Sequence, residues 1–448
     1  MRVAVIGAGI IGVTTAYELS HEGHEVTVFE RRGSVAAETS FANAGVVAPG
    51  YVTPWAAPGM PGKVLRHLFS KHSPVRVAPT LNPATLGWMW RWWRACSTNT
   101  WQANRTNMQR LAFFSRERLH ALTHRLQLDY ERGQGYLVLL RTAQDLAMAK
   151  PGLKLLTELG TRFHLVDAAR CREIEPGLNP ETALHAGIHL EDDEVGNCRE
   201  FATLMRGEAQ RLGARFRFHT QVLGLEPGKA PGVVHLYSPP ADSTQLVPGP
   251  DTPNHDGPHT EPMPFEPTTD RFDAVAVCAA MGSSALLRPH GLKLPLLAVH
   301  GYSVTAPVRR HDNHPDLGPR SALMDERYKV AISRLGARIR VAGSAEVGGD
   351  PVHQRADMLD TLYKVLNDWY PAAPNLNQAQ RWKGARPMLP DGPPVLGASG
   401  IEGIWLNLGH GSSGWALACG SASILNDLIS GRSAAIDTRG LGVERLRR

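Results

Sequence analysis

Residues 3–30 constrain this chain more than any other segment, because an apolar strand, a glycine-rich turn, a helical segment and a second apolar strand follow one another. In the turn, Gly7 permits the tight change of direction, Gly9 lets a pyrophosphate approach the backbone, and Gly12 lets the helix pack closely on the strand. The helix N-terminus offers unpaired N–H groups and the positive end of its dipole. Glu30 closes the second strand at the distance where an acid binds ribose hydroxyls. The segment therefore predicts a dinucleotide-binding βαβ unit.

The alternative is a glycine-rich surface turn in an ordinary βα unit, which the flanking strand, helix and acid disfavour. The expected nucleotide contacts lie in the first strand, the turn, the start of the helix and the end of the second strand. They are Val3, Val5, Ile6, Gly7, Ala8, Gly9, Ile10, Ile11, Gly12, Glu30 and Arg31.

A second glycine-rich turn lies about 400 residues further along the chain, between an expected strand at residues 402–408 and an expected helix at residues 415–429. Its residues are Gly409, His410, Gly411, Ser412, Ser413 and Gly414. One dinucleotide needs only one cradle for its pyrophosphate, so a second helix N-terminus indicates another electron-rich group. The N1–C2=O edge of an isoalloxazine ring gains negative charge on reduction and fits this need. A glycine turn that only packs the helix is the alternative.

Two shorter segments carry further candidate residues. Residues 38–45 place small and hydroxyl side chains soon after the ribose-binding acid, where Ser40, Ala44 and Gly45 are expected near the pyrophosphate and the flavin. Arg386 stands in a turn framed by Gly and Pro, and its planar guanidinium matches a carboxylate bidentately. Taken alone, residues 38–45 are also compatible with a polar loop. Arg386 taken alone is also compatible with a solvated surface charge.

Together these segments resemble the FAD-dependent amine oxidoreductases of the D-amino-acid oxidase and glycine oxidase superfamily, and the bacterial D-amino-acid dehydrogenase small subunits in particular. The likeness extends over nearly the whole chain. The matching stretches are VAVIGAGIIGVTTAYELSHEGHEVTVFE at 3–30, ETSFANAG at 38–45, TPWAAPG at 53–59, DDEVGNC at 192–198, HGYSV at 300–304, RVAGSAEVGG at 340–349, GARPMLPDGPPVLG at 384–397 and NLGHGSSGWALACGSA at 407–422.

The resemblance implies roles for individual residues. Gly7, Gly9, Gly12 and Glu30 would hold the ADP half of FAD, and Val222 would lie near the adenine. Ser40, Ala44, Gly45 and residues 411–414 would surround the flavin. Arg386 would bind the substrate carboxylate, and Tyr302 would line the substrate pocket. For His410 two roles stay open, a base or a packing residue that covers the flavin, and packing is the commoner one beside glycines at a helix start.

The pattern of elements predicts an α/β fold in which a discontinuous Rossmann-like FAD-binding domain receives an inserted substrate domain. The FAD-binding domain is expected at residues 1–80, 145–225, 270–292 and 385–448. The substrate domain, a mainly antiparallel β-sheet plus helices, is expected at 81–144 and 293–384. Residues 226–269 are rich in Pro, Asp, Thr, Ser and His, and are longer than expected for the family. They are interpreted as a hairpin with a long excursion of uncertain order.

The expected reaction is oxidative deamination of D-amino acids to 2-oxo acids and ammonia, by hydride transfer from Cα to FAD. It needs position and electrostatics rather than a protein base at Cα, which agrees with the lack of a convincing Ser/His/Asp or Cys/His set. The resemblance favours a quinone or another respiratory-chain component as electron acceptor. The alternatives are a glycine, sarcosine or cyclic amino acid oxidase, and a non-catalytic FAD-binding subunit of a larger complex; a nicotinamide enzyme would lack the second cradle.

Charge and composition narrow the partners. The net charge is +6, but no dense Lys/Arg block stands out, so nucleic-acid binding is not expected. The five cysteines are scattered without metal-like spacing, which predicts reduced thiols and no metal site. The nucleotide strand begins at the N-terminus, and no run of 18 apolar residues occurs. A cytoplasmic protein is expected, with possible peripheral contact with the inner membrane.

The basis for a membrane contact is the aromatic run at residues 88–94. At helical spacing, one face would carry Trp88, Met89, Trp92 and Trp93, and Arg91 and Arg94 would point away. Such a face could lie in a membrane interface. Packing on the substrate domain is the commoner fate of an apolar stripe, and it is the favoured interpretation.

Overall fold

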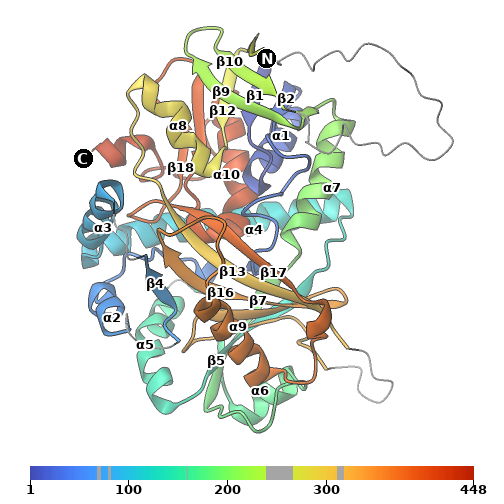
Figure 1. Ribbon diagram of the computed structural model, residues 1–448, viewed down its shortest axis with the longest axis vertical. Coiled ribbons are helices and arrows are strands. Elements are labelled where there is room, and N and C mark those ends of the chain that lie inside the picture. The colour runs from blue at the N-terminus through green and yellow to red at the C-terminus, as the bar shows by residue number, and fades with distance from the viewer. Residues whose placement is uncertain (68–71, 79–81, 159, 239–265, 310–316, 448) are drawn as a thin grey trace, which may run out of the picture.

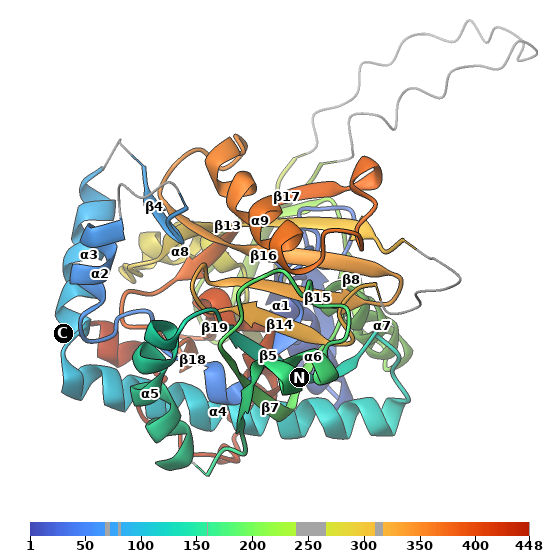
Figure 2. The same cartoon turned by 90° about the horizontal axis from the view of Figure 1, so that it is seen from below.

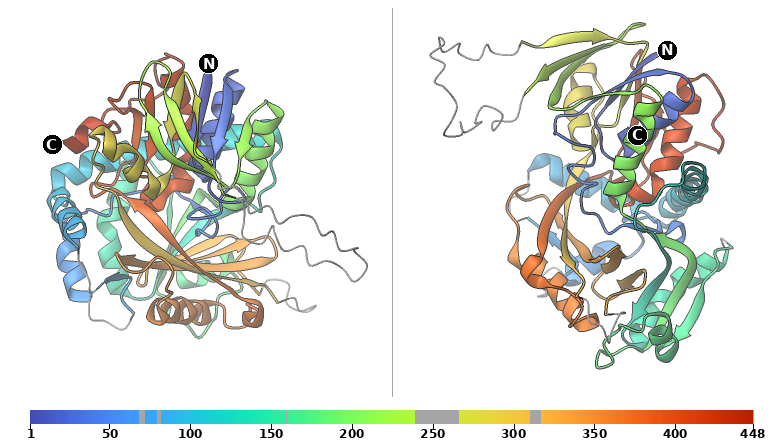
Figure 3. Two further views of the ribbon diagram at one scale, coloured as in Figure 1. Left: turned by 45° about the horizontal axis from the view of Figure 1, so that its top comes forward. Right: turned by 90° about the vertical axis from the view of Figure 1, so that its right-hand side faces the viewer.

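The computed structural model describes residues 1–67, 72–78, 82–158, 160–238, 266–309 and 317–447. These residues form two stacked lobes (Figures 1 and 3). The upper lobe in Figure 1 contains a six-stranded and a three-stranded sheet, and the lower lobe a ten-stranded sheet. This is the expected α/β fold, a Rossmann-like FAD-binding domain with an inserted substrate domain.

The six-stranded sheet is parallel except at β18, which runs antiparallel to β19. In spatial order its strands are β18 (Val395–Ala398), β19 (Ile404–Leu408), β12 (Ala274–Val277), β1 (Arg2–Ile6), β2 (Glu25–Phe29) and β8 (Arg215–Arg217). β12 is buried along its whole length, as an apolar run covered on both faces of a parallel sheet should be. Segments from both ends of the chain therefore share one sheet, with β12 between β1 and β19.

Helices cover one face of this sheet, and a small antiparallel sheet packs near the other. The helices are α1 (Ile10–His21), α7 (Cys198–Arg211) and α10 (Gly414–Ile429), with the long α4 (Thr98–Leu126) against α10. The small sheet consists of β9 (Thr220–Glu226), β10 (Gly232–Tyr237) and β11 (Thr268–Arg271). β10 and β11 form the expected hairpin, and the excursion between them falls mostly at 239–265, outside the described residues.

The ten-stranded sheet is mainly antiparallel, as expected for the substrate domain. Its main path is β17 (Gln380–Met388), β13 (Leu297–Pro307), β16 (Arg338–Val347), β15 (Val330–Leu335), β14 (Ala322–Asp325), β5 (Gly133–Leu140), β7 (Ala186–Val195) and β3 (Val46–Val47), and two short strands join it, β4 (Val75–Val77) and β6 (His164–Asp167). Helix α9 (Ala356–Trp369) packs on one face of β13 and β16. The remaining helices are α2 (Met60–His67), α3 (Pro83–Ala95), α5 (Ala143–Glu158), α6 (Ala168–Ile174) and α8 (Ser283–Leu287).

Four strands lie in a different sheet from the one that the expected domain boundaries imply. β3, β4, β6 and β7 fall within ranges expected for the FAD-binding domain, 1–80 and 145–225, but they pair in the ten-stranded sheet. The expected assignment is wrong for these strands, because local periodicity predicts a strand but not its distant partner. The other boundaries stay a prediction.

The helical spacing expected at residues 88–94 is confirmed, because these residues lie in α3, which α4 follows in the chain. In Figure 2, α4 runs along the lower edge of the view and α3 lies at its left edge. Among the described helices, none is both long enough and apolar enough to cross a bilayer.

Candidate active site

The first glycine turn has the geometry of a phosphate cradle. Gly7 has a φ of +99° in the left-handed region, and a Cβ on Gly12 would lie 1.8 Å from the Gly7 carbonyl oxygen. Gly9 is the N-cap of α1, and among the described residues a Cβ there would have only the Ser40 Oγ within 4 Å, at 3.6 Å. Ser40 Oγ also accepts a hydrogen bond from the Ile10 N–H, at 3.1 Å. In the described part of the chain, the Ser40 hydroxyl is thus the one side-chain group close to this end of the helix backbone, which leaves room that fits a pyrophosphate.

The carboxylate of Glu30 lies beside this cradle at the end of β2. It accepts hydrogen bonds from the backbone N–H groups of Ala8, at 2.7 Å, and Arg32, at 2.8 Å. Burial raises the pKa of Glu30, and these two N–H donors oppose that rise. Glu30 is thus oriented where a ribose would lie, whereas the exposed Arg31 forms a bidentate pair with Glu38.

The loop at residues 42–45 is held by side chains from distant elements. Each of its four consecutive carbonyl oxygens accepts a hydrogen bond from one side chain. The donors are Ser303 of β13, Arg340 of β16, Ser333 of β15 and Trp415 of α10, at 2.8, 2.9, 2.6 and 3.1 Å in the order of the loop. The loop, which contains Ala44 and Gly45, is therefore fixed between the two lobes. No local sequence pattern indicates these donors, because each lies far from the loop in the chain.

The second glycine turn adjoins the end of β17. Residues Gly411–Ser413 form a single 3₁₀ turn that leads directly into α10. His410 forms an isolated β-bridge with Met388, and a Cβ on Gly411 would lie 2.6 Å from the Met388 Sδ. Trp55 donates a hydrogen bond from Nε1 to the Ser412 Oγ, at 3.1 Å. This cradle therefore lies against the strand that carries Arg386, as a flavin near the substrate requires.

Arg386 is partly buried on the face of β17 that adjoins this cradle. Its Nη1 donates to the Ser344 carbonyl oxygen at 3.0 Å, and its guanidinium lies over the ring of Trp55. Among the described residues, no carboxylate lies within ion-pair distance of Arg386. Loss of hydration lowers the pKa of Arg386 to about 10, so its charge is costly without an anion. The site provides an arginine that is ready for a carboxylate.

Gly301 provides the room for this arginine, and Gly384 provides the room for the Trp382 ring. A Cβ on Gly301 would lie 2.3 Å from the Arg386 Nη2, and a Cβ on Gly384 would lie 1.9 Å from the ring of Trp382. Residues at alternate positions of a strand share a face, so Trp382 and Arg386 both lie on the face of Gly384. The guanidinium therefore has the Trp55 ring beside it and shares its face of β17 with Trp382, and no local sequence pattern indicated either tryptophan.

Tyr302 lies on the other face of the sheet. In the register of β13 and β17, Val299 is opposite Arg386 and Tyr302 is opposite Lys383, so alternation places Tyr302 and Arg386 on opposite faces. Tyr302 is fully buried in the core that includes α9, and its hydroxyl donates to the Glu346 Oε2 at 2.6 Å. The structure therefore does not bring Tyr302 into the pocket, and the expected pocket role is wrong.

His410 is buried and bound to the helix behind it. Its Nε2 lies 3.1 Å from the Oγ of Ser421, about two turns into α10. Desolvation lowers the pKa of His410 to about 3, which leaves the ring neutral and a very weak base. Of the two roles left open by the sequence, packing at the start of the second cradle is favoured.

Val222 lies on β9, partly buried against the apolar cluster that contains Phe29 at the end of β2. Its contact with adenine stays a prediction.

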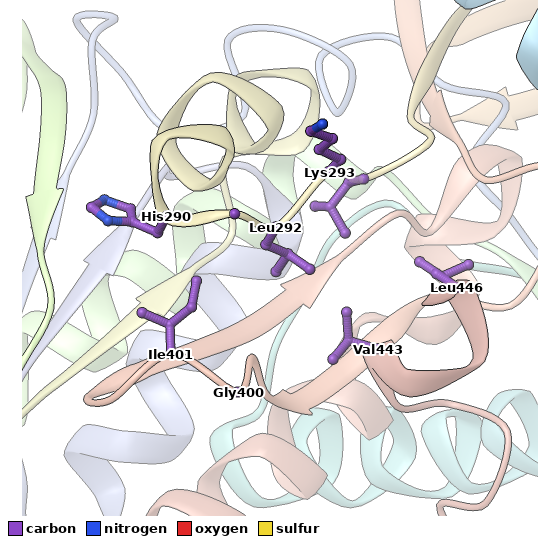
Figure 4. Close-up of a pocket in the computed structure, with 9 residues that line it drawn as sticks. His290, Leu292, Lys293, Gly400, Ile401, Val443 and Leu446 are labelled. Carbon is purple, nitrogen blue, oxygen red and sulfur yellow. The ribbon is translucent and has the colours of Figure 1, made fainter. Parts of the chain in front are cut away.

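A cavity of about 370 Å³ lies elsewhere in the upper lobe, between the loop at 290–294, the β18–β19 turn and the C-terminal 3₁₀ helix (Figure 4). None of the expected site residues lines it, so the candidate site is not this cavity.

The structure contains two glycine turns that each lead into a helix, and they come from opposite ends of the chain. One turn fits the pyrophosphate of an adenine dinucleotide, and the other fits an isoalloxazine ring. The fold and the site thus define a flavin-dependent oxidoreductase. Residues 2–428 match the family described as FAD dependent oxidoreductase, and the chain belongs to that family. FAD is therefore the cofactor that the two cradles fit.

Two relatives that match the chain over its full length are both named D-amino acid dehydrogenase. A D-amino acid dehydrogenase of Cereibacter sphaeroides is 42% identical over 451 residues, which cover 99% of this chain and 95% of that protein. A D-amino acid dehydrogenase of Agrobacterium fabrum is 38% identical, and the alignment covers 99% of each chain. Among solved structures, glycine oxidase from Geobacillus kaustophilus has a TM-score of 0.71 at 18% identity and covers 99% of this chain and 98% of its own. That similarity confirms the fold.

Proposed function

We propose that this protein is a dehydrogenase of D-amino acids, which converts them to 2-oxo acids and ammonia. The relatives named D-amino acid dehydrogenase match the chain along its whole length, which supports this substrate class. The observation that carries the proposal is the partly buried Arg386, which has a backbone carbonyl and an aromatic ring as neighbours but no recorded carboxylate partner among the described residues. A substrate carboxylate would supply the missing anion.

When FAD is bound, it supplies the acceptor for the hydride that leaves the substrate Cα. The lone pair of a neutral amine forms the C=N bond as the hydride departs, and water then hydrolyses the imino acid. The protein's part is to orient the substrate: Arg386 fixes the carboxylate, and the rings of Trp55 and Trp382 border that position. His410, with its low pKa, takes no proton in this scheme.

The electrons leave the reduced enzyme for a respiratory-chain acceptor, of which a quinone is the proposed example. A quinone acceptor would require peripheral contact with the inner membrane. A carboxylate-binding arginine argues against a non-catalytic FAD-holding subunit, which would have no use for one.

The test is anaerobic reduction of the purified holoprotein. With D-alanine, the visible flavin absorption should bleach within seconds, and L-alanine at the same concentration should leave it unchanged. Failure of D-alanine and other D-amino acids to bleach the flavin would contradict the proposal. Bleaching by glycine or sarcosine instead, with rapid reoxidation by oxygen, would identify an oxidase.

A further inference from the structure

One part of the chain is entirely free of acidic residues. Residues 39–116 contain no Asp or Glu, but they contain nine Lys and Arg residues. At the chain's overall frequency of 42 acidic residues in 448, a stretch of this length would hold about seven. Helices α2 and α3 lie in this stretch, along the same edge of the molecule (Figures 1 and 2). The charged side chains that these two helices present are therefore all Lys or Arg, and no Asp or Glu of either helix neutralises them.

Helix α3 has one face in the protein and a second apolar face outside it. Trp88 is buried, and its Nε1 donates to the Met388 carbonyl oxygen at 3.1 Å. On the opposite side, Leu86, Trp90 and Trp93 are 51%, 58% and 54% exposed. Their spacing of four and three residues places them on one stripe. The favoured packing interpretation is thus confirmed for Trp88, but Trp93 lies on the outer stripe and not on the face where the sequence pattern placed it.

The outer stripe is ordered and flanked by charge. The rings of Trp90 and Trp93 stack with their centres 5.1 Å apart. Arg91 and Arg94 are exposed beside them, and in α2 Leu65 is 69% exposed between the exposed Lys63 and Arg66. The "α2–α3 surface" consists of Lys63, Leu65, Arg66, Leu86, Trp90, Arg91, Trp93 and Arg94.

We propose that the α2–α3 surface docks on an anionic lipid bilayer, with the tryptophan rings at headgroup level and the basic side chains against lipid phosphates. Exposed tryptophans beside Arg and Lys, with no acid near them in the chain, match the chemistry of such an interface. An acidic protein surface would complement the charge too, but stacked indoles flanked by flexible cationic chains suit a fluid interface better than a fixed one. The α2–α3 surface would be the site of the proposed peripheral contact. The reason for such a contact rests on the proposed function, but the binding of lipid can be tested without it.

The test is flotation of the full-length holoenzyme with vesicles. Vesicles with 30% phosphatidylglycerol in phosphatidylcholine should carry the protein, and vesicles of phosphatidylcholine alone should carry far less. Arg91→Gln with Arg94→Gln should weaken binding roughly 30-fold, since each basic residue near an anionic surface contributes about a fivefold factor. Trp90→Ser with Trp93→Ser should abolish flotation even at low salt. High salt should release the wild-type protein in part.

Matched controls lie on the far side of the molecule. Arg211→Gln with Arg215→Gln changes two exposed charges at the end of α7 and in β8, and Leu212→Ser removes an exposed apolar side chain; both should float like the wild type. Reduction of a soluble dye by D-alanine should be unchanged in the α3 variants, which separates this proposal from the proposed function. Equal flotation of wild type and α3 variants, or none with anionic vesicles, would overturn it. So would conversion of a lipid-free dimer to a monomer by the tryptophan changes, because the partner would then be a second copy.

Discussion

The guanidinium carbon of Arg386 lies 5.9 Å from the centre of the Trp55 ring, and Trp55 in turn donates a hydrogen bond to Ser412 in the second glycine turn. One aromatic side chain thus connects the group proposed to bind the substrate with the turn that fits the flavin. The position of the substrate relative to the ring that oxidises it would depend on this connection.

Trp55→Phe should test this connection. Phenylalanine keeps an aromatic face over Arg386 but cannot donate to Ser412. The lost hydrogen bond is worth about 1 kcal/mol, so kcat/KM for D-alanine should fall roughly fivefold with flavin content nearly unchanged. Trp55→Ala, which also removes the ring over the guanidinium, should cost several-fold more. Steady-state kinetics normalised to bound FAD would check both, and equal kcat/KM in all three proteins would show that Trp55 does not position the substrate.

Gly9→Val should abolish FAD binding without unfolding the protein. Within the described ranges, a Cβ at this position would have only the Ser40 Oγ within 4 Å, at 3.6 Å, so the added side chain would fill the space for the pyrophosphate rather than clash with the chain. Gly12→Ala provides the contrast, because its Cβ would meet the Gly7 carbonyl at 1.8 Å and should destabilise the fold. Circular dichroism melts and the flavin-to-protein absorbance ratio would separate these effects. A Gly9→Val protein with full flavin would show that the first cradle is assigned wrongly.

Ser333→Ala should loosen the loop at residues 42–45. The substitution removes the donor to the partly buried Ala44 carbonyl, and a carbonyl left unpaired away from water costs about 1–3 kcal/mol. The apoprotein should bind FAD roughly tenfold more weakly, because part of that cost is recovered only when the loop moves. Ser20→Ala is a matched control, since Ser20 is buried and its hydroxyl has no recorded partner among the described residues. If both variants bind FAD equally well, the loop does not depend on this donor.

His410 should contribute to the pH dependence of stability. Its pKa is about 3 in the folded protein and near 6.5 when unfolded, so the unfolded state binds the extra proton between these values. The free energy of unfolding should therefore fall as the pH is lowered below 6.5, and by about 2 kcal/mol at pH 5 from this group alone. Urea melts at pH 7.5 and pH 5 would measure this change in the free energy of unfolding. In His410→Asn, the difference between the free energies at the two pH values should be smaller by that amount. An unchanged difference would mean that His410 is accessible to protons.

The parts of the site that sequence predicted are those built from contiguous residues. The glycines of the first cradle, Glu30 and the turn before α10 each depend on a strand, a turn and a helix that follow one another, and local pattern is sufficient for these. Arg386 was predicted because Gly and Pro frame it and because its stretch resembles a family motif. The hairpin was predicted from the composition of residues 226–269 and from one strand signal at 232–237, which is β10, whereas its partner β11 had no strand signal of its own.

The parts that sequence missed depend on contacts between distant segments. Tyr302 and Arg386 are separated by the register of β13 against β17, which no local pattern specifies. The donors to the 42–45 loop lie about 260 to 370 residues away in the chain. β7 was placed in the wrong domain for the same reason, and Trp93 on the wrong face because α3 has an apolar stripe on each side.

The most direct test of the account is Arg386→Ala, with flavin occupancy and kcat/KM for D-alanine measured on the same preparation. Removing the partner of a buried carboxylate costs about 3–5 kcal/mol, so kcat/KM per bound FAD should fall a few hundred- to a few thousand-fold while FAD content stays normal. Arg386→Lys should recover only part of the loss, because an ammonium cannot reproduce the planar fork. Lower thermal stability and lost flavin, with kcat/KM per bound FAD nearly unchanged, would instead show that Arg386 only braces β17 and would contradict the proposed substrate site.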